Sequence, residues 1–184
     1  MREIWQYILS DYYRYYKELY PSVWRILKIV FCSDNYGFQY SFSLRFCSAP
    51  NPLWRIARRQ HEKLSVKLGV YIPGSTKIGY GFYIGHPVSI VINEGTILGN
   101  NVNISQCLTI GSNNNTPAKI GNNVYIGPSV NIVEDVVIGD NVIIGAGSVV
   151  VHDVDNNITV AGVPAKMLGE NKHPEYVQNR WILE

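Results

Sequence analysis

The stretch IGNNVYIGPSVNIVEDVVIGDNVIIGAGSVV, residues 120–150, decides the fold of this chain. An aliphatic residue returns in it every six positions, at Ile120, Ile126, Ile132, Ile138, Ile144 and Val150. A helix repeats every 3.6 residues and an ordinary strand every two, so neither explains this period. Each hexad is expected to form one short strand and one turn, and three hexads to close each coil of a triangular β-solenoid.

The same period extends back to residue 72 and breaks twice. Its earlier positions are Ile72, Ile78, Ile84, Ile92, Leu98, Ile104 and Ile110. The first break, GHPVSIV, follows Ile84 and contains His86, and the second, GSNNNTPAK, follows Ile110. A solenoid that interrupts its own repeat does so where a functional loop is inserted. If three hexads form each coil, the two breaks in the repeat fall at different corners of the prism, and one chain holds them on separate edges. A site that contains both loops therefore requires a neighbouring subunit.

Composition divides the 184 residues into two differently built parts. Residues 1–70 contain eleven Lys and Arg against five Asp and Glu, and residues 71–184 contain five against nine. We therefore expect a helical region at 1–70, the solenoid at 71–169 and a tail or short helix at 170–184. Helices are predicted at 10–19, 21–31 and 52–69, with Gly69 as a stop.

The basic half also contains many Trp and Tyr residues. This composition favours a helical collar that packs on the first coil, and the alternative is contact with a membrane surface. The net charge of +2 argues against nucleic-acid binding. No apolar run approaches the length of a membrane span. Three scattered cysteines form neither a zinc motif nor a disulfide framework. A reduced, cytoplasmic protein is expected, with the inner membrane surface as the alternative location.

Two segments carry a resemblance to a known family. The exit segment IGAGSVVVHDVDNNITVAGVPAKMLG, residues 144–169, resembles the hexapeptide-repeat acyltransferases, and GFYIGHPVSIVINEGTILGNNVNISQCLTIG, residues 81–111, resembles their serine acetyltransferase branch. The resemblance implies a mainly β protein, a left-handed parallel β-helix with N-terminal helices. It also implies a homotrimer with active sites between subunits, acetyl-CoA as cosubstrate and no metal.

Within this resemblance His86 matches the catalytic histidine and Glu94 a glutamate of the branch. Three departures stand beside these matches. Tyr71 occupies the place of an aspartate fifteen residues before the histidine, Gly85 replaces an aspartate directly before it, and residues 116–119 lack a second histidine. The remaining pattern resembles the saccharide O-acetyltransferases of capsule and surface polysaccharide synthesis.

Transfer of an acetyl group to an alcohol needs a base for the hydroxyl proton, and a histidine titrating near pH ~6.5 suits that role. His86 is the candidate base, and a solvated corner residue is the alternative. Glu94 is expected to bind the acceptor or polarise His86, or else to be a charged corner residue. Tyr71 is expected to cap the first coil, or to hydrogen-bond His86. His61 and His173 lie outside the repeats and are expected at the surface.

Coenzyme A is expected in a groove between two prisms, where small residues let it approach the backbone. The small candidates are Gly111, Gly127, Ala146 and Gly147. His152 is a candidate polar contact and Lys166 a candidate for a nucleotide phosphate. For each glycine, turn geometry is the alternative explanation.

The leading interpretation is an acetyl-CoA-dependent O-acetyltransferase acting on a saccharide hydroxyl. The alternatives are a serine acetyltransferase of cysteine biosynthesis and a non-catalytic scaffold. A zinc hydratase is rejected, because such a site needs three convergent histidines and the repeats contain only His86 and His152. The sequence does not name the acceptor.

Overall fold

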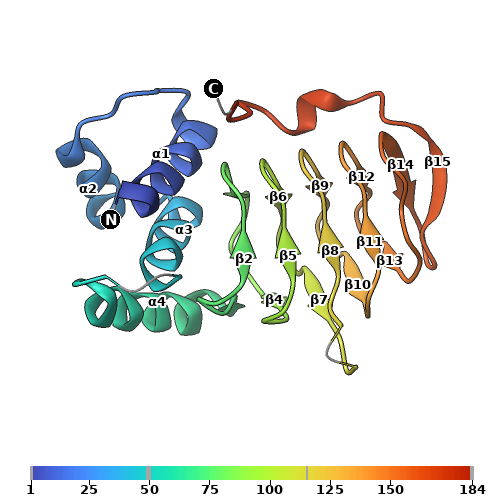
Figure 1. Ribbon diagram of the computed structural model, residues 1–184, viewed down its shortest axis with the longest axis horizontal. Coiled ribbons are helices and arrows are strands. Elements are labelled where there is room, and N and C mark those ends of the chain that lie inside the picture. Colours follow the sequence, from blue (N-terminus) through green and yellow to red (C-terminus); the bar gives the residue numbers. More distant parts are fainter. Residues whose placement is uncertain (1, 49–50, 115, 183–184) are drawn as a thin grey trace.

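The computed structural model describes residues 2–48, 51–114 and 116–182, and it contains four α-helices followed by a parallel β-solenoid (Figure 1). The predicted fold class is confirmed. The helices are α1 (Arg2–Tyr16), α2 (Val23–Cys32), α3 (Tyr36–Cys47) and α4 (Trp54–Leu68). They gather at one end of the solenoid, beside its first coil (Figure 1).

Three sheets form the faces of the solenoid, and we name them A, B and C. Sheet A contains β1 (Val70–Tyr71), β4 (Ile90–Ile92), β7 (Thr109–Gly111), β10 (Asn131–Val133) and β13 (Val149–Val150). Sheet B contains β2 (Lys77–Ile78), β5 (Ile97–Leu98), β8 (Lys119–Ile120) and β11 (Val137–Ile138). Sheet C contains β3 (Tyr83–Ile84), β6 (Asn103–Ile104), β9 (Tyr125–Ile126), β12 (Ile143–Ile144), β14 (Ile158–Ala161) and β15 (Lys166–Glu170).

The aliphatic residues of the six-residue repeat stack in register and form the buried core. Ile84 pairs with Ile104, for example, and both side chains are buried. Stacking is what stabilises such a coil, because one hexad alone has no second layer against which to bury its aliphatic side chain. The solenoid also contains a third irregularity in coil length, which the six-residue period of the sequence did not reveal. Ile138 pairs with Val154, sixteen residues on, although Ile132 pairs with Val150, eighteen residues on.

Asparagines line the corner at which the chain passes from sheet B to sheet C. Asn101, Asn123, Asn141 and Asn157 all have positive φ angles, between 55° and 62°. Asparagine tolerates this left-handed backbone better than other side chains that carry a Cβ. Each of the first three also donates its side-chain amide to the next, at 3.2, 3.1 and 2.9 Å. The polar corners expected from the sequence are therefore present as a continuous ladder.

The helical region differs from the prediction in two ways. α1 begins eight residues before the predicted start at residue 10, and α3 lies in a segment where no helix was predicted. α3 is buried around most of its circumference, so it lacks the one-sided apolar pattern by which a helix is recognised. Gly37 at its start lets the helix approach β3 closely, because a Cβ there would clash with the carbonyl oxygen of Ile84. Gly69 ends α4 with a φ of 64°, as predicted.

A buried ion pair attaches the helices to the first coil. Asp11 of α1 accepts two hydrogen bonds from Arg45 of α3, both at 2.8 Å, and one from the backbone N–H of Phe82, also at 2.8 Å. Arg45 donates in turn to the carbonyl oxygens of Ile78 and Gly79. This clamp fixes α1, α3 and the first coil relative to one another.

His61 was expected at the surface, and that expectation is wrong. Its side chain is buried between α3 and α4, within hydrogen-bond distance of Ser43 Oγ (3.1 Å) and the carbonyl oxygen of Ile72 (3.2 Å). Burial lowers the pKa of His61. The sequence did not predict this burial, because His61 joins the helices to the first coil. Periodicity does not reveal a contact between two separate segments.

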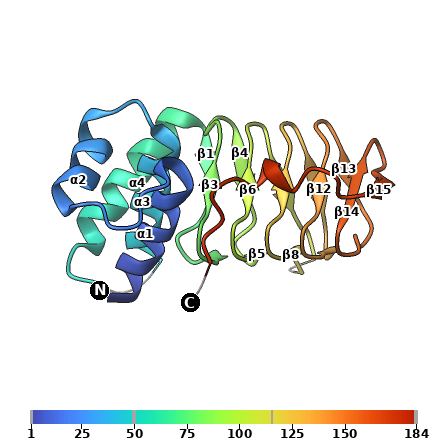
Figure 2. The ribbon, with the colours of Figure 1, turned by 90° about the horizontal axis from the view of Figure 1, so that it is seen from above.

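The C-terminal segment, residues 171–182, returns along the solenoid to α1, and we call it the strap (Figures 1 and 2). Asn103 of β6 donates to the carbonyl oxygen of Tyr176 at 2.9 Å, and Arg14 of α1 donates to that of Gln178 at 2.8 Å. Trp181 donates its backbone N–H to Asn101 Oδ1 at 2.7 Å. The strap thus forms a wall along the outer side of sheet C.

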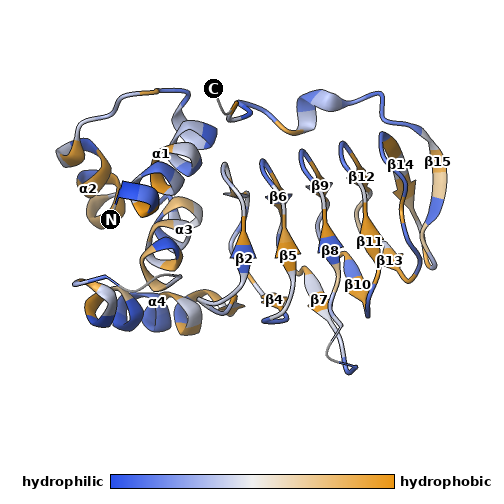
Figure 3. Ribbon diagram, viewed as in Figure 1, coloured by the Kyte–Doolittle hydropathy of each residue, from blue (hydrophilic) through white to orange (hydrophobic). Residues whose placement is uncertain are grey.

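The outer surface of the helical region carries exposed apolar side chains. Trp24 and Phe31 of α2 are largely exposed, and α2 carries much of the hydrophobic colour of the helical region in Figure 3. Among the described residues no helix is long and apolar enough to cross a bilayer. The contact of residues 1–70 with a membrane surface stays a prediction.

Candidate active site

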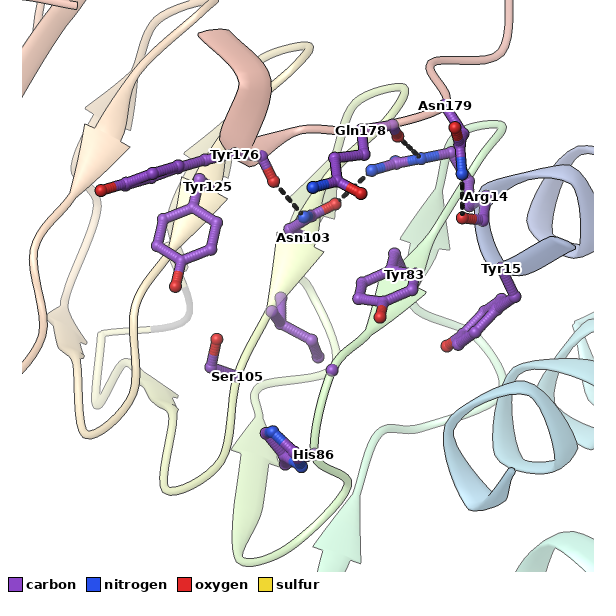
Figure 4. A pocket seen from close by; sticks show the side chains of 12 residues that line it. Arg14, Tyr15, Tyr83, His86, Asn103, Ser105, Tyr125, Tyr176, Gln178 and Asn179 are labelled. Atoms are coloured by element: carbon purple, nitrogen blue, oxygen red, sulfur yellow. Dashed lines mark hydrogen bonds between the residues drawn. The ribbon is translucent and has the colours of Figure 1, made fainter. Parts of the chain in front are cut away.

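His86 lies two residues after β3, at the corner where the chain passes from sheet C to sheet A. Its side chain is exposed, and its imidazole has no hydrogen-bond partner among the described residues. The backbone N–H of Val88 donates to the His86 carbonyl oxygen at 2.9 Å and tightens the turn. The first break in register therefore directs His86 out of the prism, into a position where its ring is free to accept a proton (Figure 4).

Two pockets flank His86, and both are lined by Tyr15, Tyr83 and Gly85 as well. Pocket I, of about 330 Å³, lies between sheet C, α1 and the strap. Its other lining residues are Arg14, Asn103, Ile104, Ser105, Tyr125, Tyr176, Gln178 and Asn179 (Figure 4). Pocket II, of about 460 Å³, lies on the helical side and is lined further by Asp34, Asn35, Tyr36, Gly37, Leu68, Pro87 and Val88.

The two pockets differ in charge. Arg14 lines pocket I, is only 3% exposed and donates to the carbonyl oxygens of Gly81 and Gln178 and to Asn103 Oδ1. Burial lowers the pKa of Arg14 to about 10, so the guanidinium stays charged at neutral pH. The one carboxylate that lines pocket II is that of Asp34. An acceptor with a positive and a negative end therefore meets opposite charges on the two sides of His86.

Two tyrosines form the wall that the pockets share. Tyr15 packs against Tyr83 with ring centroids 4.4 Å apart. The Tyr15 hydroxyl donates to the Ile84 carbonyl oxygen at 3.1 Å and accepts from the Ile84 N–H at 2.9 Å. Burial raises the pKa of Tyr15 well above its ordinary value, so the phenol stays neutral. These bonds hold the strand that precedes His86 against α1.

Several pocket residues were missed by sequence reasoning, above all Arg14 and Ser105. Arg14 comes from the helical region and the strap residues from the other end of the chain, so no local motif contains them. Ser105 did leave a signal. The residue that follows the inward aliphatic of sheet C is glycine at 85, 127 and 145, and Ser105 interrupts that series.

Three of the residues predicted for coenzyme A share a corner with His86. Gly127, Ala146 and Gly147 occupy the turns from sheet C to sheet A in later coils, and the bond from Gly147 N–H to the Pro128 carbonyl oxygen (2.8 Å) joins two of these turns. Ala146 and Gly147 are exposed. Gly127 is buried, and a Cβ there would lie 2.8 Å from Ala146 N, so packing alone explains this glycine.

The other predicted coenzyme residues lie elsewhere. Gly111 ends β7 and His152 follows β13, at the opposite edge of sheet A. Lys166 begins β15 in the exit hairpin, with its side chain exposed. Within one chain the two edges of sheet A are separate, so a groove between two chains is needed to bring these sets together. The second loop, residues 111–119, lies at the Gly111 edge, and its residue 115 is outside the described residues.

Glu94 and Tyr71 are not brought to His86 within the chain. Glu94 lies at the turn after β4 and accepts a hydrogen bond from Ser75 Oγ at 2.6 Å. Tyr71 is exposed on the outer side of sheet A, and both residues line a depression that does not include His86. The expected roles of Glu94 in polarising His86 or binding the acceptor, and of Tyr71 as a hydrogen-bond partner of His86, stay predictions. In the described part of the chain no three His, Cys, Asp or Glu residues converge on a metal-sized site.

Sequence comparison links the solenoid to known transferases. Residues 117–152 match the family described as "Bacterial transferase hexapeptide (six repeats)". The serine acetyltransferase of Buchnera aphidicola is 34% identical over 131 residues, which are 66% of this chain and 50% of that protein. The serine acetyltransferase of Escherichia coli K12 is 35% identical over 127 residues, 64% of this chain and 46% of that protein. Mitochondrial serine acetyltransferase 3 of Arabidopsis thaliana is 42% identical over 107 residues, 56% of this chain and 27% of that protein.

Solved structures extend the similarity to the helices. A serine acetyltransferase from Vibrio cholerae is superimposed with a TM-score of 0.77 and 27% identity, over 95% of this chain and 70% of that one. A serine acetyltransferase from Brucella abortus, in complex with coenzyme A, gives 0.75 and 26%, over 92% and 69%. The chain spans about half the length of the serine acetyltransferases of Buchnera aphidicola and Escherichia coli.

These findings correct the expected acceptor. Assignment to the saccharide O-acetyltransferases of capsule and surface polysaccharide synthesis is wrong, because the relatives at 34–42% identity and the superimposed structures are serine acetyltransferases. The departures at Tyr71 and Gly85 misled the interpretation, since single positions carry less information than similarity along the whole domain. Residues 117–152 of the solenoid match a hexapeptide-repeat family of bacterial transferases, and the chain is similar in sequence and in structure to serine acetyltransferases.

Proposed function

We propose that this protein transfers the acetyl group of acetyl-CoA to the hydroxyl of serine, with His86 as the general base. The observation that carries the proposal is the free imidazole of His86, exposed between two pockets of opposite charge. Serine is a zwitterion, so its two charged ends suit this arrangement. Similarity to serine acetyltransferases over most of the chain supports the same acceptor.

The proposed reaction is a direct transfer. The neutral imidazole of His86 takes the hydroxyl proton while the serine oxygen attacks the thioester carbon. The carbonyl oxygen gains negative charge, and hydrogen-bond donors at the site stabilise it. The intermediate then releases the coenzyme A thiolate, which takes the proton from the imidazolium. The products are O-acetylserine and free coenzyme A, and His86 returns to its neutral form.

The coenzyme is proposed to lie along the corner that leads to His86, between two subunits of a homotrimer. Exposed Ala146 and Gly147 leave the backbone accessible at this corner. Gly111, His152 and Lys166 come from other edges of the chain, and a neighbouring subunit supplies the second wall of the groove. Superimposed structures that contain coenzyme A support the fit of this ligand to the fold.

His86→Ala tests the proposal. We expect turnover with serine to fall by about 10²–10⁴-fold, the usual contribution of a positioned base. Acetyl-CoA affinity and folding should change little, because the side chain is exposed and makes no described hydrogen bond. Steady-state release of the coenzyme A thiol measures turnover, and calorimetry measures acetyl-CoA binding.

The outcomes separate the alternatives. Near wild-type turnover in the variant would remove His86 from the mechanism. A wild-type protein that releases no coenzyme A with serine would overturn the proposed function. Absence of acetyl-CoA binding in the wild type would favour the non-catalytic scaffold.

A further inference from the structure

We propose that Ser105 binds the acid group of the acceptor, and that pocket I therefore selects β-hydroxy carboxylic acids through their carboxylate. The proposal rests on the proposed function and deepens it, because it names the part of the acceptor that pocket I recognises. It assigns to Ser105 a role in specificity, separate from the proton transfer at His86.

Ser105 offers an unpaired hydroxyl at the wall of pocket I. The residue is only 8% exposed and lines pocket I. None of the described residues forms a hydrogen bond with its hydroxyl, whereas the buried hydroxyls of Ser10, Ser41, Ser43 and Ser148 all donate to neighbouring groups. Among the described residues the fully buried, unpaired hydroxyls are those of Thr76 and Thr96, so the Ser105 hydroxyl reaches the surface of pocket I, where it is free to donate a hydrogen bond to a ligand.

The register places Ser105 beside the reacting group. Ile84 pairs with Ile104, and the Gly85 N–H donates to the Ile104 carbonyl oxygen at 3.0 Å. Ser105 consequently lies next to Gly85 on the adjacent coil, about 4.8 Å away along the stack. A Cβ at Gly85 would meet nothing closer than 3.7 Å, so the pocket surface at Gly85 is uncrowded. In a β-hydroxy acid, two carbon atoms separate the hydroxyl oxygen from the carboxyl carbon, a span that suits these two neighbours.

The charge of pocket I selects the acid end of the acceptor. Arg14 lines this pocket, and no aspartate or glutamate is among its lining residues. The three hydrogen bonds of the Arg14 guanidinium go to uncharged oxygens, and no described carboxylate forms an ion pair with it. One of these oxygens belongs to Asn103, two residues before Ser105 on the same strand. The positive field therefore reaches the part of the pocket where Ser105 offers its hydroxyl as a donor.

The test compares acceptors that differ at one end. L-Serine has both charged ends, 3-hydroxypropanoate lacks the amine, L-glycerate replaces it with a hydroxyl, and L-serinamide lacks the negative charge. Ser105→Ala should raise the KM for L-serine by about tenfold or more, in line with loss of a hydrogen bond to a charged group. It should leave kcat within about threefold and the KM for L-serinamide unchanged.

Thr96→Val is the matched control, because it deletes another hydroxyl that lacks a partner among the described residues, at a position outside both pockets. This variant should retain the wild-type KM for every acceptor. Binding is measured in parallel by ligand-observed NMR on the full-length protein, so the inference does not depend on turnover.

The results distinguish this inference from the proposed function. If the wild type does not acetylate serine but binds 3-hydroxypropanoate or L-glycerate, and Ser105→Ala weakens that binding, the proposed function fails and the role of Ser105 stands. Equal effects of Ser105→Ala on L-serine and L-serinamide would overturn the inference. So would unchanged binding in the variant, or no binding of any β-hydroxy acid to the wild type.

Discussion

The buried ion pair between Asp11 and Arg45 allows a quantitative test of how the helices are held on the solenoid. The chain contains a matched surface pair, Arg58 and Glu62, with the same N–O distance of 2.8 Å. The side chains of the surface pair are each 59% exposed, whereas those of Asp11 and Arg45 are 0% and 5% exposed. The two pairs therefore differ mainly in burial.

Because one pair is buried and the other is exposed, the expected losses of unfolding free energy differ widely. Asp11→Ala leaves the Arg45 guanidinium buried and unpaired and removes the acceptor of the Phe82 N–H. Breaking one partner of a buried pair costs about 3–5 kcal/mol of unfolding free energy. Glu62→Ala removes an exposed helix pair worth about 0.3–0.5 kcal/mol. At about 2–4 °C per kcal/mol for a chain of this size, Asp11→Ala should lower Tm by about 6–20 °C and Glu62→Ala by no more than about 2 °C.

Thermal unfolding followed by circular dichroism, at one fixed protein concentration, measures both variants. A third variant, Asp11→Ala with Arg45→Met, should recover part of the lost Tm because it removes the unpaired charge. A Tm for Asp11→Ala within about 2 °C of the wild type would refute the clamp. Equal losses from the buried and the exposed pair would refute burial as the reason.

Two further predictions concern pH and assembly. Burial lowers the pKa of His61 in the folded protein, so below pH ~6.5 the unfolded chain binds more protons at this residue than the folded chain does. The contribution of neutral His61 to the free energy of unfolding is therefore present above that pH and is lost as the pH falls. His61→Gln should therefore reduce the decrease in urea midpoint between pH 7.5 and pH 5.0, and an unchanged decrease would contradict this role. Because Gly111 and His86 lie at different edges of sheet A, the active protein should sediment as a trimer or a multiple of it, and a monomer with full turnover would exclude a shared site.

Most of the solenoid could be predicted from the sequence, because its order is local. Each inward Ile or Val occupies a place set by its distance along the chain from the previous one, and the corners require residues such as Asn101 and Asn123 with left-handed backbone. The exposed corner position of His86 follows from the same counting, since an insertion in the repeat leaves the prism.

The site around His86 was decided by tertiary structure. Arg14 comes from the first helix, Ser105 from the second coil and Gln178 from the strap, and only folding brings them to one pocket. α3 escaped prediction for the same reason, because contacts on nearly all sides erase the one-sided pattern that a sequence can show. The buried positions of a repeat that stacks along one axis can be read from the spacing of residues in the sequence. The charge and shape of a pocket depend instead on segments that are distant in the sequence and meet only in the folded chain.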